Sequence, residues 1–302
     1  MKKGNMPDGV GATGGAQRAA PGRRAAAVGT NASRGRRQDV LGNRLLDALP
    51  PAHRRRISPL LQHERAELKQ ILYAPGARIE AVYFPIDAVV SILTTLSDGA
   101  GVEIATVGDE GMLGSPVVLG SNTMPAREFC QVQVPGELLR MEKTAFAEVL
   151  SQDDSFREVV QLYVQALFSQ VAQQVACNAL HSVEERCCRW LLLTHDRVHS
   201  DSFPLSQEFL AQMLGVRRAS VTLAAGALQT AKLIHYQRGE MTIVDRKGLE
   251  QVSCECYGAL RDEFDRLLSS PRTTQRGRIP SVAKHKSPGT VKKRGAISRT
   301  KS

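Results

Sequence analysis

The stretch LAQMLGVRRASVT, residues 210–222, has the pattern of two short helices joined by a glycine turn. Gly215 would supply the turn, and the second helix would open on Arg217 and Arg218. From Arg217 to Arg238 there are four Lys or Arg residues and no Asp or Glu. A helix N-terminus itself favours anions, because its free N–H groups and its dipole are positive. The stretch therefore predicts a phosphate-binding helix end.

A helical wheel at about 100° per residue separates two faces of the second helix. One face carries the residues that we predict to be buried: Val221, Ala224, Ala225 and Leu228. The other carries small or apolar residues with hydroxyls on its flanks: Ala219, Ser220, Thr222, Leu223 and Gly226. Small hydroxyl side chains beside a cationic helix end suit phosphate oxygens and the DNA major groove.

The flanking segments fit the same arrangement. Ser206 is placed to cap the first helix, with Glu208 in its positively polarised first turn. After the second helix, LIHYQRGEMTIVD at 233–245 alternates around Arg238 and the next glycine, which predicts a two-stranded wing.

Upstream, the pattern changes twice. Residues 40–72 read as short helices around Pro50 and Pro51, and residues 73–139 read as many short strands with glycine turns, typical of a small β-barrel or roll. Residues 153–180 hold neither Pro nor Gly and predict one long helix. It carries an apolar stripe at steps of four, three, four and four: Val160, Val164, Leu167, Val171 and Val175. Such a stripe could pack on the chain's own strands, but its length and spacing favour pairing with a second copy.

The net charge of +10 is unevenly distributed. Residues 1–39 hold eight Lys or Arg and two Asp, and residues 271–302 hold ten Lys or Arg and no acid. Residues 40–270 then carry 22 Lys or Arg against 28 Asp or Glu, a net charge of −6. We predict that both basic tails are disordered and either aid solubility or contact nucleic acid phosphates.

Other features exclude several classes of protein. There is no apolar run of transmembrane length, no secretory signal and no disulfide framework among the six cysteines, so we expect a cytoplasmic protein.

Cys187 and Cys188 read as buried structural residues, with thiol redox sensing as the alternative, and Cys254-x-Cys256 alone is too short for a zinc site. His195 and His199 lack a third ligand in view, so we predict no metal site. The sequence shows no arrangement of residues typical of a catalytic site, so we do not predict an enzyme.

Residues 205–244 resemble the winged helix-turn-helix of the CRP/FNR regulators, with Ala211, Gly215 and Val221 at the motif's small, glycine and buried positions. PGARIEAVYFPIDAVVSILTTL and TVGDEGMLG resemble the family's cyclic-nucleotide-type β-roll. The resemblance covers about residues 41–255 and implies a dimeric, sequence-specific DNA-binding transcription regulator that also contacts RNA polymerase.

The recognition helix departs from the family's pattern, which is Arg-Glu-Thr-Val with a further Arg two residues on. Here Arg218, Ala219, Ser220 and Val221 fill the four places, and Leu223 fills the last. Arg218 keeps the position that can bind guanine O6 and N7. We predict that the DNA-binding residues are Ser206, Gln207, Arg217, Arg218, Ala219, Ser220, Thr222, Leu223, Lys232 and Arg238.

The region that corresponds to the effector pocket differs from the family's pattern more than the recognition helix does. Members that bind cyclic nucleotides use a Gly-Glu pair and an Arg followed by a small residue. Here Glu110 and Gly111 reverse that order, and Arg127 is followed by Glu128, whose carboxylate would repel a phosphate. Glu110, Gly111 and Arg127 are the candidate pocket residues, but we predict neither a cyclic nucleotide nor an iron–sulfur cluster, since the N-terminal tail has no cysteine.

The sequence thus predicts an α+β chain with six segments. They are a basic tail (1–39), a β-roll (40–150), a dimerisation helix (151–180), a winged helix-turn-helix (181–255), a C-terminal helix (256–270) and a second basic tail (271–302). Two other functions stay open. One is a protein–protein signalling module with a ligand-binding roll, and the other is a tail-driven, non-specific DNA coater.

Overall fold

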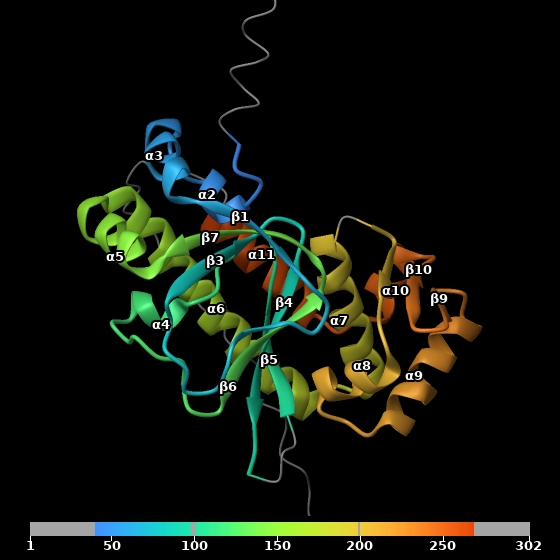
Figure 1. Cartoon of the computed structure of the whole chain (residues 1–302). Coiled ribbons are helices and arrows are strands. Elements are labelled where there is room, and N and C mark those ends of the chain that lie inside the picture. The colour runs from blue at the N-terminus through green and yellow to red at the C-terminus, as the bar shows by residue number, and fades with distance from the viewer. Residues whose placement is uncertain (1–39, 98–100, 199, 269–302) are drawn as a thin grey trace, which may run out of the picture.

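The structure is a computed structural model that describes residues 40–97, 101–198 and 200–268. The two predicted basic tails, residues 1–39 and 271–302, lie outside the described residues. No helix in the described part of the chain is long and apolar enough to cross a lipid bilayer. Figure 1 shows a β-sheet body, a long helix against it and a smaller helical unit at one end.

The β-sheet body is a roll of two antiparallel sheets with the orders β1-β7-β3 and β2-β6-β4-β5. Its strands are β1 (Gln62–Ala66), β2 (Ile71–Tyr73), β3 (Ala81–Pro85), β4 (Val89–Thr95), β5 (Gly101–Val107), β6 (Glu128–Val134) and β7 (Gly136–Glu142). The predicted roll is confirmed. Gly136 allows the segment between β3 and β4 to approach the start of β7 closely, because a Cβ there would lie 2.5 Å from Asp87 Oδ1.

Short helices cover the ends of the roll. They are α2 (Arg44–Asp47), α3 (Pro51–Ile57), the 3₁₀ turn η1 (Ser58–Leu60), α4 (Ser115–Val118) and α5 (Lys143–Gln152). The helical prediction for residues 40–72 is right only as far as Leu60, because the next residues form β1 and β2. β1 is mostly exposed, so its own hydrophobic pattern does not predict a strand. It forms a strand because its residues pair in register with those of β7.

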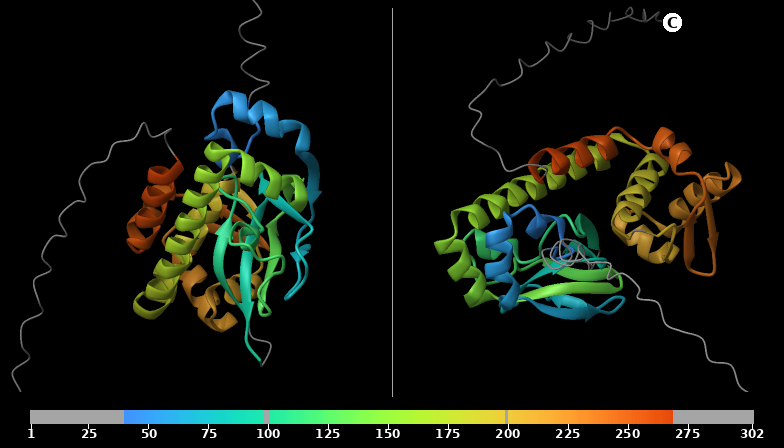
Figure 2. Two further views of the ribbon diagram at one scale, coloured as in Figure 1. Left: turned by 90° about the vertical axis from the view of Figure 1, so that its left-hand side faces the viewer. Right: turned by 90° about the horizontal axis from the view of Figure 1, so that it is seen from above.

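The long helix is α6 (Asp154–Leu180), and the side chain of Asp153 caps it by accepting a hydrogen bond from the Phe156 N–H. Its buried face joins the core of the roll, as does the C-terminal helix α11 (Cys256–Leu268) through Phe264 and Leu267. The views in Figure 2 show α11 lying along α6.

The helical unit has its own core, to which Trp190, Leu210, Val221 and Leu228 belong. Its elements are α7 (Val183–Val198), β8 (Ser202–Pro204), α8 (Gln207–Leu214), α9 (Arg218–Thr230), β9 (Ile234–Gln237), β10 (Glu240–Ile243) and α10 (Arg246–Val252). The predicted two-stranded wing has a third strand, since the sheet order is β8-β10-β9.

Helix α7 joins the helical unit to the roll through buried polar contacts. Trp190 Nε1 donates to Glu103 Oε1 at 3.0 Å, and Gln133 Nε2 donates to Thr194 Oγ1 at 2.9 Å. Burial raises the pKa of the Glu103 carboxyl, and hydrogen bonds from Ser91 and neighbouring groups oppose that shift. The two units therefore share an interface that is specified by hydrogen bonds as well as by packing.

Candidate nucleic-acid interface

The helix-turn-helix has the capping pattern that its sequence predicts. Ser206 Oγ accepts a hydrogen bond from the Phe209 N–H at 3.1 Å, so it caps α8. Gly215 ends α8 with a φ of 63°, a left-handed conformation that favours glycine. The turn also lies against β5, because a Cβ on Gly215 would be 2.9 Å from Val102 Cγ2.

The two predicted faces of α9 are confirmed by burial. Val221, Ala224, Ala225 and Leu228 are all buried in the helical unit. On the opposite face, Leu223 is 76% exposed. An apolar side chain this exposed contributes nothing to the chain's own core, so it is available for contact with another molecule.

The N-terminal end of α9 is cationic and open to solvent. Arg217, Arg218 and Ala219 are exposed, and no side chain caps the first turn. Thr222 Oγ1 donates to Gln207 Oε1 at 2.8 Å, which ties the exposed side of α9 to the start of α8. The backbone N–H groups of the first turn and both guanidinium groups can therefore face one anionic surface.

Figure 1 shows the β9–β10 wing beside α9, and two further cationic residues lie in the wing turn and just after α9. Arg238 and Gly239 have φ values of 53° and 83° and form the two-residue turn between β9 and β10, as in a type I′ hairpin. Lys232, at the end of α9, has a φ of 62°. Both cationic side chains are exposed.

The three predicted effector-pocket residues do not form a common pocket. Glu110 is buried against α7, where its Oε1 lies 2.7 Å from Arg197 Nη2 and 2.9 Å from Arg197 Nε. A Cβ on Gly111 would lie 2.4 Å from the ring of Tyr163, so α6 closes that position. Arg127 is exposed and precedes β6. Helices of the same chain therefore fill the space beside Glu110 and Gly111, whereas Arg127 is open to solvent.

A groove of about 720 Å³ lies elsewhere, between the β4–β5 hairpin and the helix-turn-helix. Its lining includes Val102, Gln212 and Arg217, and none of the predicted effector residues contributes to it. The groove thus adjoins the helix-turn-helix rather than the region expected to bind an effector.

The stripe predicted for dimerisation mostly faces the chain's own core. Val160 and Leu167 are buried in the core of the roll, and Val164 and Val171 pack against it. Only Val175 is open, at 66% exposed. The roll thus occupies the face of α6 that Val160, Val164, Leu167 and Val171 share, and of this stripe only Val175 is free for a dimer contact.

A neighbouring face of α6, which shares Val175 with the stripe, is exposed and apolar over the C-terminal half of the helix. We call it the α6 seam, formed by Phe168, Ala172, Val175 and Ala179, which are all exposed. Phe168 is 75% exposed, and the steps of four, three and four are those of a coiled-coil contact. The sequence carried this spacing, but the longer aliphatic residues of the stripe obscured it.

All six cysteines are buried and unpaired. Burial raises the pKa of the Cys187 thiol, and it raises the pKa of Cys188 to about 12, so both stay protonated. Cys254 and Cys256 are not isolated, since Cys177 and His181 lie beside them. The sequence signal for this grouping was the four-residue step from Cys177 to His181, which sequence reasoning missed.

Of the two histidines considered as metal ligands, His195 lies within the described residues. His195 Nε2 lies 2.9 Å from Asp201 Oδ1, and its Nδ1 lies 2.6 Å from Arg246 Nη1. His199 lies outside the described residues. His195 is thus engaged in a polar network between α7 and α10.

Comparison with protein families matches two segments of the chain. The model of the cyclic nucleotide-binding domain matches residues 63–153, and the model of the Crp-like helix-turn-helix domain matches residues 185–252. Together they cover more than half of the chain. The chain belongs to the CRP/FNR family of transcriptional regulators, and this family and fold are those of regulators rather than enzymes.

Solved structures share the same fold. A CRP/FNR-family regulator from Eubacterium rectale is 16% identical with a TM-score of 0.54, covering 69% of this chain and 96% of its own. TTHB099, a CRP-family regulator from Thermus thermophilus, is 18% identical with a TM-score of 0.53, covering 63% and 96%. The c-di-GMP-responsive regulator CLP from Xanthomonas campestris is 16% identical with a TM-score of 0.51, covering 64% and 99%. Among curated proteins, none matches the chain.

Proposed function

We propose that this protein regulates transcription by binding double-stranded DNA sequence-specifically as a homodimer. The observation that carries the proposal is the exposed, cationic N-terminal end of α9, with Arg217 and Arg218 in its first turn and no side-chain cap. Such a helix end can enter the major groove while the wing cations contact the flanking backbone.

The individual residues suit different contacts. Arg218 is placed to bind guanine O6 and N7 with two hydrogen bonds, and Arg217 and Ser220 are placed to contact phosphates. Ala219 and Leu223 cannot hydrogen-bond a base edge, but both can contact thymine methyl groups. We therefore propose a half-site that differs from the family's usual one.

The α6 seam supports the dimer. Its exposed apolar side chains need a partner of similar shape, and a second α6 provides one with matching spacing. Paired α6 helices would hold two α9 helices at a fixed separation, as half-sites one DNA turn apart require.

Signal input, where present, would reach α9 through the roll. Glu110 and Glu103 of the roll bind Arg197 and Trp190 of α7, and α7 packs against α9. A change at the roll would thus move the helix that supports the recognition helix. Contact with RNA polymerase is a further expectation that follows from the family.

Gel-shift titration against a pool of chromosomal fragments tests the proposal. Specific binding should survive excess competitor DNA and fall gradually with salt, as counterion release predicts. A protein-docking module would give only weak, salt-quenched association. Deleting residues 1–39 and 271–302 tests the alternative of a tail-driven, non-specific DNA coater. We expect lower affinity with unchanged site preference, whereas a coater would lose DNA binding altogether.

A further inference from the structure

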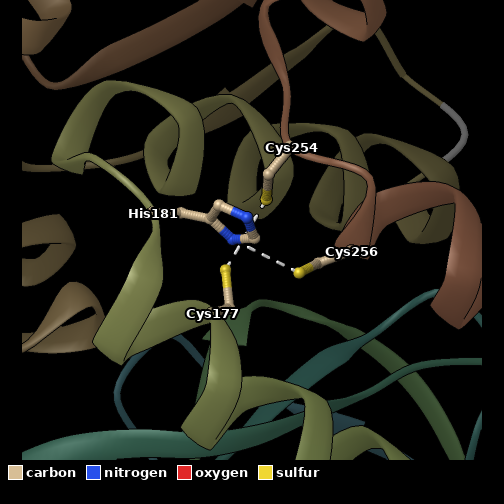
Figure 3. Close-up of side chains that lie close together, drawn as sticks. All are labelled: Cys177, His181, Cys254 and Cys256. Carbon is tan, nitrogen blue, oxygen red and sulfur yellow. Dashed lines mark hydrogen bonds between the residues drawn. The ribbon is translucent and has the colours of Figure 1, made fainter. Parts of the chain in front are cut away.

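Four side chains with metal-binding atoms converge where the end of α6 meets the start of α11. They are Cys177, His181, Cys254 and Cys256, and their ligand atoms all lie within 4.8 Å of one another. Figure 3 shows the three thiols and the imidazole pointing toward one another from these two segments. All three thiols are buried and His181 is partly buried, so the group is screened from bulk solvent.

Two of the distances between the ligand atoms match the edges of a tetrahedron around one ion. With Zn–S of about 2.3 Å and Zn–N of about 2.0 Å, a regular site has S···S edges near 3.8 Å and S···N edges near 3.5 Å. Here Cys177 Sγ and Cys254 Sγ are 3.6 Å apart, and Cys256 Sγ and His181 Nδ1 are 3.5 Å apart. The spacing therefore fits a single tetrahedral ion and is too compact for ligands spread over two irons.

The surroundings suit a site that carries negative charge. Three thiolates around a divalent ion give a net charge of −1. Arg189 is only 2% exposed and donates to Gln174 Oε1 at 2.6 Å, and its Nε has no hydrogen-bond partner within the described residues. Arg186 is also buried, at 7% exposed, and its Nε likewise has no hydrogen-bond partner within the described residues. Buried guanidinium groups need a compensating anion, and a thiolate-rich metal site would supply it.

An outer hydrogen bond orients one of the thiols. Gln173 Nε2 donates to Cys256 Sγ at 3.0 Å, in the manner of groups that hold ligands in place around a metal. The imidazole also has a partner, because His181 Nε2 lies 3.3 Å from Glu255 Oε2. A carboxylate on the second ring nitrogen leaves Nδ1 directed at the thiols, which is the arrangement that fixes a metal-binding tautomer.

We propose that Cys177, His181, Cys254 and Cys256 bind one zinc ion in a closed, tetrahedral Cys₃His site. The ion would join the C-terminal end of α6 to the segment between α10 and α11. Because all four positions are taken by protein ligands, the site is structural rather than catalytic.

The test uses the full chain, purified in reductant from zinc-supplemented cells and dialysed against metal-free buffer. Elemental analysis should give one zinc per chain. Replacement by cobalt should give the intense visible bands of a tetrahedral ion together with thiolate charge-transfer absorption. Cys254→Ser should weaken zinc binding by more than about 100-fold, beyond the roughly 10–100-fold effect of losing an outer-shell partner.

Two further variants keep the test decisive if Cys254→Ser does not fold. Cys188→Ser, in a buried cysteine outside the cluster, should retain zinc. His181→Cys should also retain the ion, with a stronger charge-transfer band from the fourth thiolate. Folded, reduced protein that takes up no zinc would overturn the proposal. So would full zinc binding by a Cys177→Ser/Cys254→Ser double variant, or the presence of two irons with labile sulfide.

Discussion

The carboxylate of Glu110 and the guanidinium of Arg197 form a buried ion pair between the roll and α7, with both side chains 5% exposed. Arg197 also donates from Nη1 to the Leu193 carbonyl at 2.7 Å, so the pair is embedded in a hydrogen-bonded setting. A residue expected to belong to an effector pocket is thus part of the joint between the two halves of the chain.

Removing one partner of this pair should be costly, because the other would be left as a buried, uncompensated charge. We expect Glu110→Ala to lower the free energy of unfolding by about 3–5 kcal/mol. Urea denaturation followed by circular dichroism measures this. Glu263→Ala, at an ion pair with Arg266 that is more exposed, is the control and should cost less than about 1 kcal/mol. Equal effects would show that the buried pair has no special role.

The Glu110–Arg197 ion pair also affects whether this region can bind a cyclic nucleotide. With Glu110 bound to Arg197, Gly111 closed off by Tyr163 and Arg127 exposed beside Glu128, no set of donors for a cyclic phosphate and ribose is assembled from these positions. We expect isothermal titration calorimetry with cyclic AMP and cyclic GMP to show no binding at micromolar concentrations. A micromolar dissociation constant for either would refute this expectation.

Charge in the α6 seam should separate the subunits. Phe168→Glu changes an exposed side chain, so the monomer should fold while the dimer weakens by about 2 kcal/mol or more, roughly 30-fold in Kd. Sedimentation velocity measures the change. Leu119→Glu is a matched control, since Leu119 is also exposed, at 74%, but lies beside α4.

Leu167 provides the contrast within the same helix. It is 8% exposed and packs in the core of the roll, so Leu167→Glu should unfold or strongly destabilise the chain rather than yield a folded monomer. If Phe168→Glu remained fully dimeric, the subunits would have to meet at another surface.

Arg218 and Arg217 should affect DNA binding in different ways. Arg218→Ala should cost about 1–3 kcal/mol and relax base preference at one position of each half-site. Arg217→Ala should weaken binding to all sequences and lower the salt dependence by about one unit of slope. Footprinting and salt titration separate the two effects. An unchanged consensus with Arg218→Ala would show that this arginine does not bind a base.

The sequence predicts the buried and exposed faces of α9 well, because its apolar residues follow a single helical period. That period places Val221 and Leu228 in the core and leaves the arginines outside. The same rule fails on α6, where apolar residues occupy both the face against the roll and the seam. Periodicity alone cannot say which face meets a partner. In the sequence, the valine and leucine residues give the inner face a stronger hydrophobic pattern than Phe168 and the alanines give the outer face.

The thiol cluster shows a second limit. Cys177 and Cys254 are 77 residues apart, with Cys177 in the last turn of α6 and Cys254 in the connection between α10 and α11. Neither the Cys177-x₃-His181 step nor Cys254-x-Cys256 suffices alone, because the packing of α11 on α6 creates the site. Ligands that come together only in the tertiary structure are not visible as a sequence motif.

Selection from a library of randomised duplexes, using the full-length protein, tests the central claim most directly. Two paired subunits that present α9 to adjacent major grooves should enrich a two-fold symmetric motif with half-site centres about 10 base pairs apart. Enrichment should disappear in an Arg217→Ala/Arg218→Ala double variant. Recovery of no motif, or of the same motif by the double variant, would contradict the account.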